Sequence, residues 1–190
     1  MPALQTEVGM VRVPPGTWNV DPSHSSVAFE VKHLMISTVR GHFREFEGTI
    51  EAAEDDPSNS RCYGSVKVAS IDTGDPKRDE HLRSPDFFDA EKYPEMRFES
   101  THIENIEGPL YRMRGNLTIK DQTREVEFDA SVEGVAEDPW GNDRVGISVR
   151  GEVNRTEFGL TWQQVLASGG LMVGETVKVL IDVSAVRAAD

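Results

Sequence analysis

The chain has 190 residues and a formal net charge of −13, with 37% hydrophobic and 28% charged residues. This size and composition are typical of one globular domain, and the strong negative charge argues against nucleic acid or anionic lipid surfaces as partners. Cys62 is the only cysteine, so an internal disulfide and a zinc site made of several thiolates are both excluded.

Residues 1–15 precede the first regular pattern, and we expect them to form a flexible N-terminal arm before a folded domain over 16–190. They show no basic stretch followed by an apolar stretch, as a secretory signal would. No run in the chain approaches the roughly 20 apolar residues that span a bilayer. We therefore expect a cytoplasmic protein without a transmembrane segment.

The dominant pattern is an alternation of apolar and polar residues with the period of two that strands have. It predicts eight strands, centred on residues 27–32, 39–50, 62–68, 96–100, 111–119, 126–132, 145–153 and 177–183. In the second strand the phase slips by one residue between Phe43 and Phe46, which we interpret as a β-bulge. One apolar and one polar face per strand is typical of antiparallel sheets.

Two stretches break this alternation. Residues 76–83 are predicted to form a short helix, with Asp75 as its N-cap. Residues 161–170 are predicted to form a second helix, because Trp162 and Val165 share one helical face and two glycines follow.

Eight antiparallel strands with few helices form either a sandwich or a closed barrel. Five glycines fall at predicted inward positions: Gly41, Gly48, Gly64, Gly115 and Gly151. Inward glycine leaves space unfilled or allows sharp strand coiling, and an eight-stranded barrel is just wide enough for one small ligand. We therefore predict an all-β fold, an eight-stranded antiparallel barrel with one or two short helices at its ends, in which Gly115 faces an open tunnel.

Several motifs occur in a characteristic order and spacing: WNVDPSHS (18–25) and VAFEVKH (27–33), VRGHF (39–43), IDTG (71–74) and RDEHLRSPDFFD (78–89), then GNLTI (115–119) and RTEFGL (155–160). Over about residues 16–186 the chain resembles the YceI-like family of bacterial polyisoprenoid-binding proteins. The resemblance implies an extended lipocalin-like barrel with a long isoprenoid chain, such as an isoprenoid quinone or a polyprenyl compound, in an apolar tunnel. Many members are secreted to the periplasm, whereas this chain resembles the cytoplasmic branch.

The predicted inward side chains suit an alkyl or prenyl ligand, since burying each CH₂ contributes about 0.8 kcal/mol and methionine adapts to irregular surfaces. A dry core filled by the same side chains is the alternative. The predicted ligand-binding residues are Phe29, Val31, Phe43, Val66, Val68, Met96, Phe98, Met113, Phe128, Ile147 and Trp162.

Charged residues gather around the first predicted helix, namely Asp72, Asp75, Arg78, Asp79 and His81. In one interpretation they form a polar mouth, where Arg78 or His81 donates a hydrogen bond to the head group of the ligand. In the other they cap the helix and fix it over the end of the barrel.

We expect no metal, no cofactor and no catalytic residue. The histidines lack the short fixed spacing of common metal motifs. Asp21, His24 and Ser25 supply the residue types of a catalytic triad, but a triad is defined by geometry. Trp140, in a turn-rich loop, is interpreted either as an exposed anchor for a membrane or partner or as a plug of the barrel end.

These observations favour a binding protein, not an enzyme, that carries or sequesters an apolar isoprenoid-type lipid. An enzyme acting on a similar ligand in the same cavity, with His81 as acid or base, is one alternative. A stress-linked structural protein without a dedicated ligand is another. A homodimer is also expected, since exposed strand edges can pair.

Overall fold

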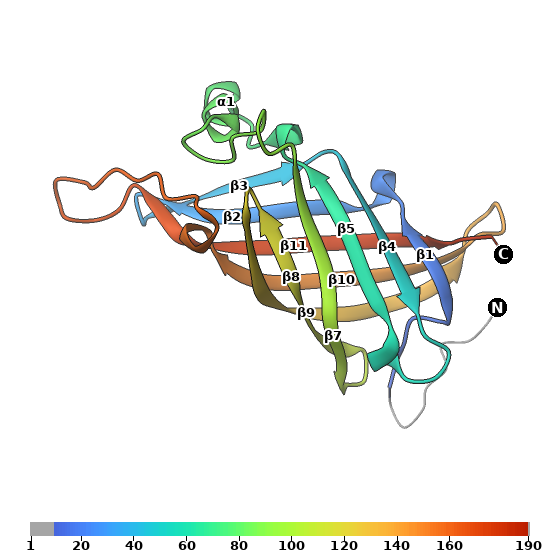
Figure 1. Cartoon of the computed structure of the whole chain (residues 1–190). Coiled ribbons are helices and arrows are strands. Elements are labelled where there is room, and N and C mark those ends of the chain that lie inside the picture. Colours follow the sequence, from blue (N-terminus) through green and yellow to red (C-terminus); the bar gives the residue numbers. More distant parts are fainter. Residues whose placement is uncertain (1–9, 190) are drawn as a thin grey trace.

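The computed structural model describes residues 10–189 (Figure 1). One α-helix, α1 (Pro76–Arg83), accompanies the strands of this part of the chain. The strands are β1 (Gly16–Val20), β2 (Ser26–His33), β3 (Ser37–Phe43), β4 (Phe46–Ala52), β5 (Arg61–Lys67), β6 (Ile71–Asp72), β7 (Glu95–Glu107), β8 (Leu110–Ile119), β9 (Gln122–Glu137), β10 (Asp143–Asn154) and β11 (Val173–Arg187).

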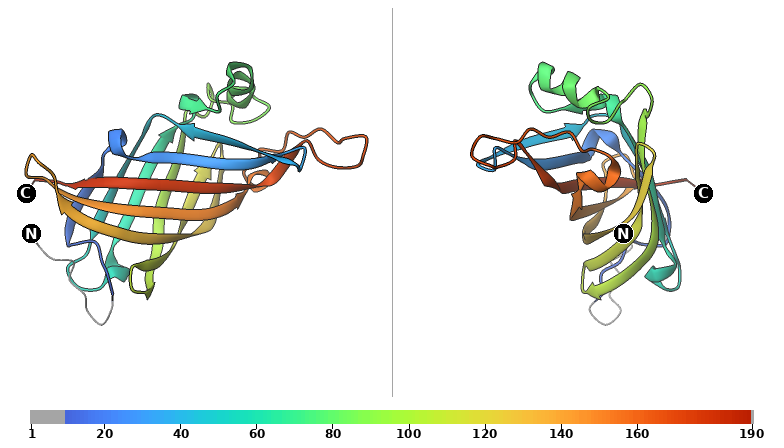
Figure 2. Two further views of the ribbon diagram at one scale, coloured as in Figure 1. Left: turned by 180° about the vertical axis from the view of Figure 1, so that it is seen from behind. Right: turned by 60° about the vertical axis from the view of Figure 1, so that its left-hand side comes forward.

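Eight strands close into an antiparallel barrel in the order β1-β4-β5-β7-β8-β9-β10-β11. The barrel closes because β11 pairs back with β1, with Trp18 opposite Arg187. The other three strands, β2, β3 and β6, extend the wall from β11 beyond this closure. The predicted eight-stranded all-β barrel is therefore confirmed, and Figure 2 shows the extension at one end of the molecule.

The extension exists because β11 is long enough to have two partners along one edge. Its last residues pair with β1, and residues 173–182 pair with β2. In the same way, β3 pairs with β2 and β6, whereas β4 pairs with β1 and β5. Arg44 and Glu45 separate β3 from β4, and both donate backbone N–H groups to Ser70. The predicted β-bulge between Phe43 and Phe46 is therefore wrong: the phase slips at a break between two strands.

Helix α1 begins as predicted, with the Asp75 carboxylate accepting the N–H groups of Lys77 and Arg78. The second predicted helix, over 161–170, is wrong. This segment forms an irregular loop with an isolated bridge between Val165 and Leu171. Gly169 adopts φ +85°, and paired glycines are poor helix formers, so local turn bonds take the place of a helical ladder.

The residues that precede β1 pack against the wall of the barrel. Val11 donates its N–H to the carbonyl of Gly108 and accepts the Tyr111 hydroxyl at 2.6 Å. The fully buried Trp18 indole donates to the Pro14 carbonyl. Residues 1–9 of the predicted arm lie outside the described residues, and residues 11–15 lie against the barrel. Within residues 10–189, no helix is both long and apolar enough to cross a membrane.

Candidate ligand-binding site

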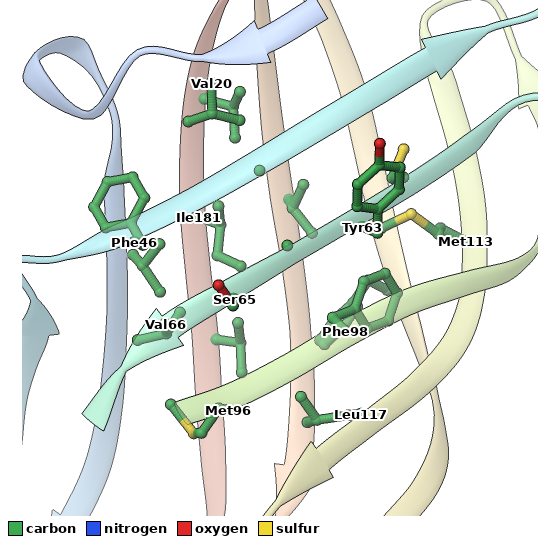
Figure 3. A pocket seen from close by; sticks show the side chains of 18 of the residues that line it. Val20, Phe46, Tyr63, Ser65, Val66, Met96, Phe98, Met113, Leu117 and Ile181 are labelled. Carbon is green, nitrogen blue, oxygen red and sulfur yellow. The ribbon is translucent and has the colours of Figure 1, made fainter. Parts of the chain in front are cut away.

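The barrel encloses a cavity of about 390 Å³ with an almost entirely apolar lining (Figure 3). All eight strands of the closed barrel contribute to this lining, together with β2 and β3 of the extension. The alternation of each strand places its apolar residues on the concave face, so the cavity follows from the sequence pattern. In Figure 3, Val66, Met96, Phe98 and Met113 project from neighbouring strands around the cavity.

Nine of the eleven predicted ligand-binding residues line this cavity, all but Val68 and Trp162. Val68 is buried outside the cavity, in a 3₁₀ turn over 68–70 that follows β5. The Trp162 ring packs against the rings of His81 and Phe87, at centroid distances of 4.9 and 5.4 Å. The structure therefore brings most of the predicted set together and places these two side chains elsewhere.

The segment from α1 to residue 93 forms a cap over one end of the barrel, and it also contributes to the lining. Leu82, Phe87 and Phe88 reach the cavity. Phe88 meets Phe43 edge to face at 6.0 Å between ring centroids. The sequence analysis missed these three residues because they lie outside any strand, although two adjacent phenylalanines in a polar segment were a usable signal.

Arg78 and His81 lie in the cap but do not line the cavity. Arg78 donates from Nε to Thr73 Oγ1 and from Nη2 to the Thr73 carbonyl, both at 2.7 Å. The buried Asp79 accepts the Thr73 N–H and hydroxyl. His81 Nε2 lies 2.8 Å from Asp86 Oδ2. These contacts hold the cap together, and a head-group role for Arg78 or His81 stays a prediction.

Arg155 is a cavity-lining residue that the sequence analysis did not single out. It is 5% exposed and forms no ion pair among the described residues. Its guanidinium donates to four backbone carbonyls, those of Leu160, Trp162, Val173 and Gly174. Burial lowers the pKa of Arg155, yet arginine stays protonated in proteins, so a positive charge lies beside an apolar cavity.

The predicted open space at Gly115 is wrong. A Cβ on this residue would lie 2.6 Å from the Glu99 backbone oxygen and 2.6 Å from Phe98 Cε2. The rings of Phe29 and Phe128 cover Gly41 and Gly151 in the same way. At these three positions, glycine gives room to a neighbouring phenylalanine rather than to a tunnel.

Cys62 and the Asp21 cluster show little catalytic character. Burial raises the pKa of the Cys62 thiol to about 12, so at neutral pH it is not a thiolate nucleophile. Ser23 Oγ and Asp21 Oδ2 both contact the same nitrogen of His24, Nδ1, so the ring does not relay a proton between them. The third candidate, Ser25, donates its hydroxyl to the Ser184 carbonyl instead.

Trp140 lies in the turn between β9 and β10 and is 80% exposed. Its backbone N–H donates to Asp138, so the turn itself is well defined. An indole this exposed does not plug the end of the barrel.

Similarities to known proteins place the chain in a family. A UPF0312 protein of Staphylococcus epidermidis is 36% identical over 162 residues, which cover 85% of this chain and 92% of the relative. The YceI protein of Campylobacter jejuni superposes with a TM-score of 0.71 at 31% identity, covering 89% of this chain and 96% of that one. A polyisoprenoid-binding domain from Saccharophagus degradans shares the fold, with a TM-score of 0.70 at 13% identity and coverage of 90% and 98%. The family model of the YceI-like domain matches residues 18–185, and the chain therefore belongs to the YceI-like family.

Proposed function

We propose that the protein binds an apolar isoprenoid-type lipid, an isoprenoid quinone or a polyprenyl chain, in the barrel interior and carries or sequesters it. The observation that carries this proposal is the apolar cavity of about 390 Å³ inside the closed barrel. Its size lies in the range of small-molecule sites, about 300–1,000 Å³. The name of the S. degradans neighbour, a polyisoprenoid-binding domain, supports the ligand class.

The size of the cavity also bears on the length of the ligand. If one carbon takes about as much room as a water molecule, roughly 30 Å³, the cavity has room for at least about a dozen carbons. Burying that many CH₂ groups contributes about 10 kcal/mol, which is comparable with association costs of about 4–15 kcal/mol. One five-carbon unit contributes only about 4 kcal/mol. A ligand therefore needs at least two isoprene units in the barrel for burial to exceed even the lowest of these costs.

We place the polar end of the ligand near Arg155. Its guanidinium has five N–H groups, and four of them donate to backbone carbonyls of the described residues. We propose that the fifth, on Nη2, donates to a quinone carbonyl or a phosphate oxygen of the ligand. Arg78→Met is the matched control, because Arg78 is bound to Thr73 outside the cavity. Arg155→Met should lose quinone while Arg78→Met retains it; the reverse would assign the head group to the cap.

A non-catalytic role is part of the proposal. The cavity-lining thiol of Cys62 is held protonated by burial, and His81 is bound to Asp86 outside the cavity. Incubation with a recovered ligand should leave its mass unchanged. A changed mass would favour an enzyme that uses the same cavity.

Organic extraction of the purified protein, followed by mass spectrometry of the extract, tests the proposal directly. Native mass spectrometry of the intact complex gives the stoichiometry. We expect close to one isoprenoid-type molecule per barrel. An empty barrel after purification without detergent, which also takes up no added isoprenoid quinone, would contradict the proposal and favour a filled structural core.

A cytoplasmic location and a homodimer remain predictions. Cell fractionation tests the first, and light scattering on the purified protein tests the second.

A further inference from the structure

The β2–β3 turn lies beside the loop over residues 161–172 at one end of the molecule (Figures 1 and 2). Both segments carry exposed apolar residues. Ile36 is 82% exposed, Val165 69% and Met35 54%, and Leu34 is also exposed. The Leu34 N–H donates to the Met172 carbonyl at 2.8 Å, which joins the two segments. We call these four exposed residues, Leu34, Met35, Ile36 and Val165, the apolar tip.

The turn that presents the tip is strained. Leu34 and Met35 have φ of 54° and 60°, and Ile36 donates its N–H to the His33 carbonyl. Two central residues with positive φ are typical of a type I′ turn, which strongly prefers Asn-Gly. Bulky apolar residues there cost roughly 1–2 kcal/mol each. Strain of this kind, combined with apolar exposure, indicates a surface with a function.

The charge around the tip differs from that of the rest of the chain. Asp and Glu make up 33 of the 190 residues, yet residues 31–44 and 158–174 contain none. The tip residues lie within these two segments. The ionisable residues of β2 that lie nearest to the tip along the chain are Lys32 and His33. Glu30, which precedes the first segment, is paired with Arg40. The two segments that form the tip of this acidic protein thus carry no carboxylate themselves, although Glu157 and Glu175 flank the second segment, and the tip can approach a lipid surface with little charge repulsion.

The tip also lies close to the cavity. Val31 on β2 and Val173 on β11 both line the cavity. Val173 pairs with His33, the residue before Leu34 of the tip. Val31 is three residues from Leu34, about 10 Å along an extended strand. Leu160, at the start of the exposed loop, lines the cavity as well, and Arg155 holds its carbonyl.

We propose that the apolar tip inserts into the surface of a zwitterionic lipid bilayer and holds the barrel there while a lipid enters or leaves. This inference rests on the proposed carrier function. A bilayer fits the tip better than a second copy of the chain does. A stable dimer interface needs about 20–30 residues a side, far more than these two short segments offer.

Sedimentation with phosphatidylcholine vesicles tests the proposal. The wild-type protein should bind, and the variant Ile36→Asp with Val165→Asp should show a partition coefficient at least tenfold lower. The matched control is Ile106→Asp with Leu110→Asp, because these two residues are similarly apolar and about half exposed, but flank the β7–β8 turn. The control should bind like the wild type. Thermal unfolding of each variant checks that it is folded.

Three outcomes would overturn the proposal: no binding of the wild type, equal loss in the control variant, or loss in Trp140→Asp but not in the tip variant. A dimer in light scattering that the tip variant converts to a monomer would also overturn it, in favour of a second copy. Ligand content, measured by extraction, separates the two proposals. Vesicle binding by a protein that neither contains nor takes up an isoprenoid lipid would leave the membrane contact of the tip standing and would contradict the carrier function.

Discussion

At the scale of single residues, the inner face of the barrel depends on pairs of phenylalanine and glycine from neighbouring strands. Phe98 lies over Gly115, whose missing Cβ also gives room to the Glu99 carbonyl. The ring thereby fills the volume that a larger residue at 115 would need. A backbone oxygen cannot move aside as a flexible side chain can, so the glycine is required for the spacing of β7 and β8.

Replacement of Gly115 by alanine should therefore lower the free energy of unfolding by about 2 kcal/mol, within the range for overpacked sites. Gly134→Ala is the matched control, because a Cβ there meets no atom within 4 Å. We expect a change near zero for the control. Urea unfolding of both variants measures the difference, and equal effects at the two positions would contradict the role of the Phe98 ring.

At the scale of elements, the alternation of residue types predicted most of the strands, though not β1 or β6, because a barrel wall has one solvent-exposed and one apolar face along most of its length. The loop over 161–170 was harder, because Trp162 and Val165 have helical spacing for unrelated reasons. Trp162 packs on the cap, whereas Val165 is exposed at the tip. A periodic pattern cannot distinguish one shared face from two separate contacts.

A change in the β2–β3 turn should raise the stability of the protein and weaken its binding to vesicles. Replacing Leu34-Met35 by Asn-Gly places residues that favour positive φ at both central positions. We expect an increase in the free energy of unfolding of about 2 kcal/mol, from the roughly 1–2 kcal/mol of strain at each position. Vesicle binding should fall at the same time, because two apolar side chains are lost. A variant that is no more stable than the wild type would contradict the strain argument. Unchanged vesicle binding would contradict the role of these two side chains in the tip.

The β9–β10 turn should make stability depend on acid pH. The Asn142 N–H and the Arg144 guanidinium, among other donors, lower the pKa of Asp138 to about 2, and Arg144 also binds Asp21 of the turn after β1. Because the folded-state pKa is depressed, this contribution is present above about pH 4 and is lost as the pH falls toward 2. Asp138→Asn should be less stable than the wild type at pH 7 and close to it near pH 2. Urea midpoints at the two pH values measure this, and a constant difference would contradict the assignment.

At the scale of the whole molecule, the sequence predicted the barrel and most of the apolar lining, because both follow from the direction of alternate side chains on a strand. It did not predict the cap residues Phe87 and Phe88, or Arg155, whose positions depend on how irregular segments fold back over the end of the barrel. The charged residues around the first helix led us to predict Arg78 and His81 as contacts of the ligand head group. Only the structure shows that these two bind within the cap, while Arg155 lies beside the cavity.

Filling the cavity should separate lipid binding from stability. Leu117 on β8 lines the cavity and projects into it in Figure 3, whereas its neighbour Thr118 does not line it and bonds to Thr123 on the outer wall. Leu117→Trp places a larger side chain where the lipid would lie, so extraction should recover at least tenfold less lipid than from the wild type. Thr118→Trp should retain it. Added isoprenoid quinone should raise the melting temperature of Thr118→Trp but not of Leu117→Trp, because a ligand at 100 times its Kd stabilises by about 2.7 kcal/mol. If both tryptophan variants keep their lipid, the ligand lies outside the barrel, and the apolar interior is a core rather than a binding site.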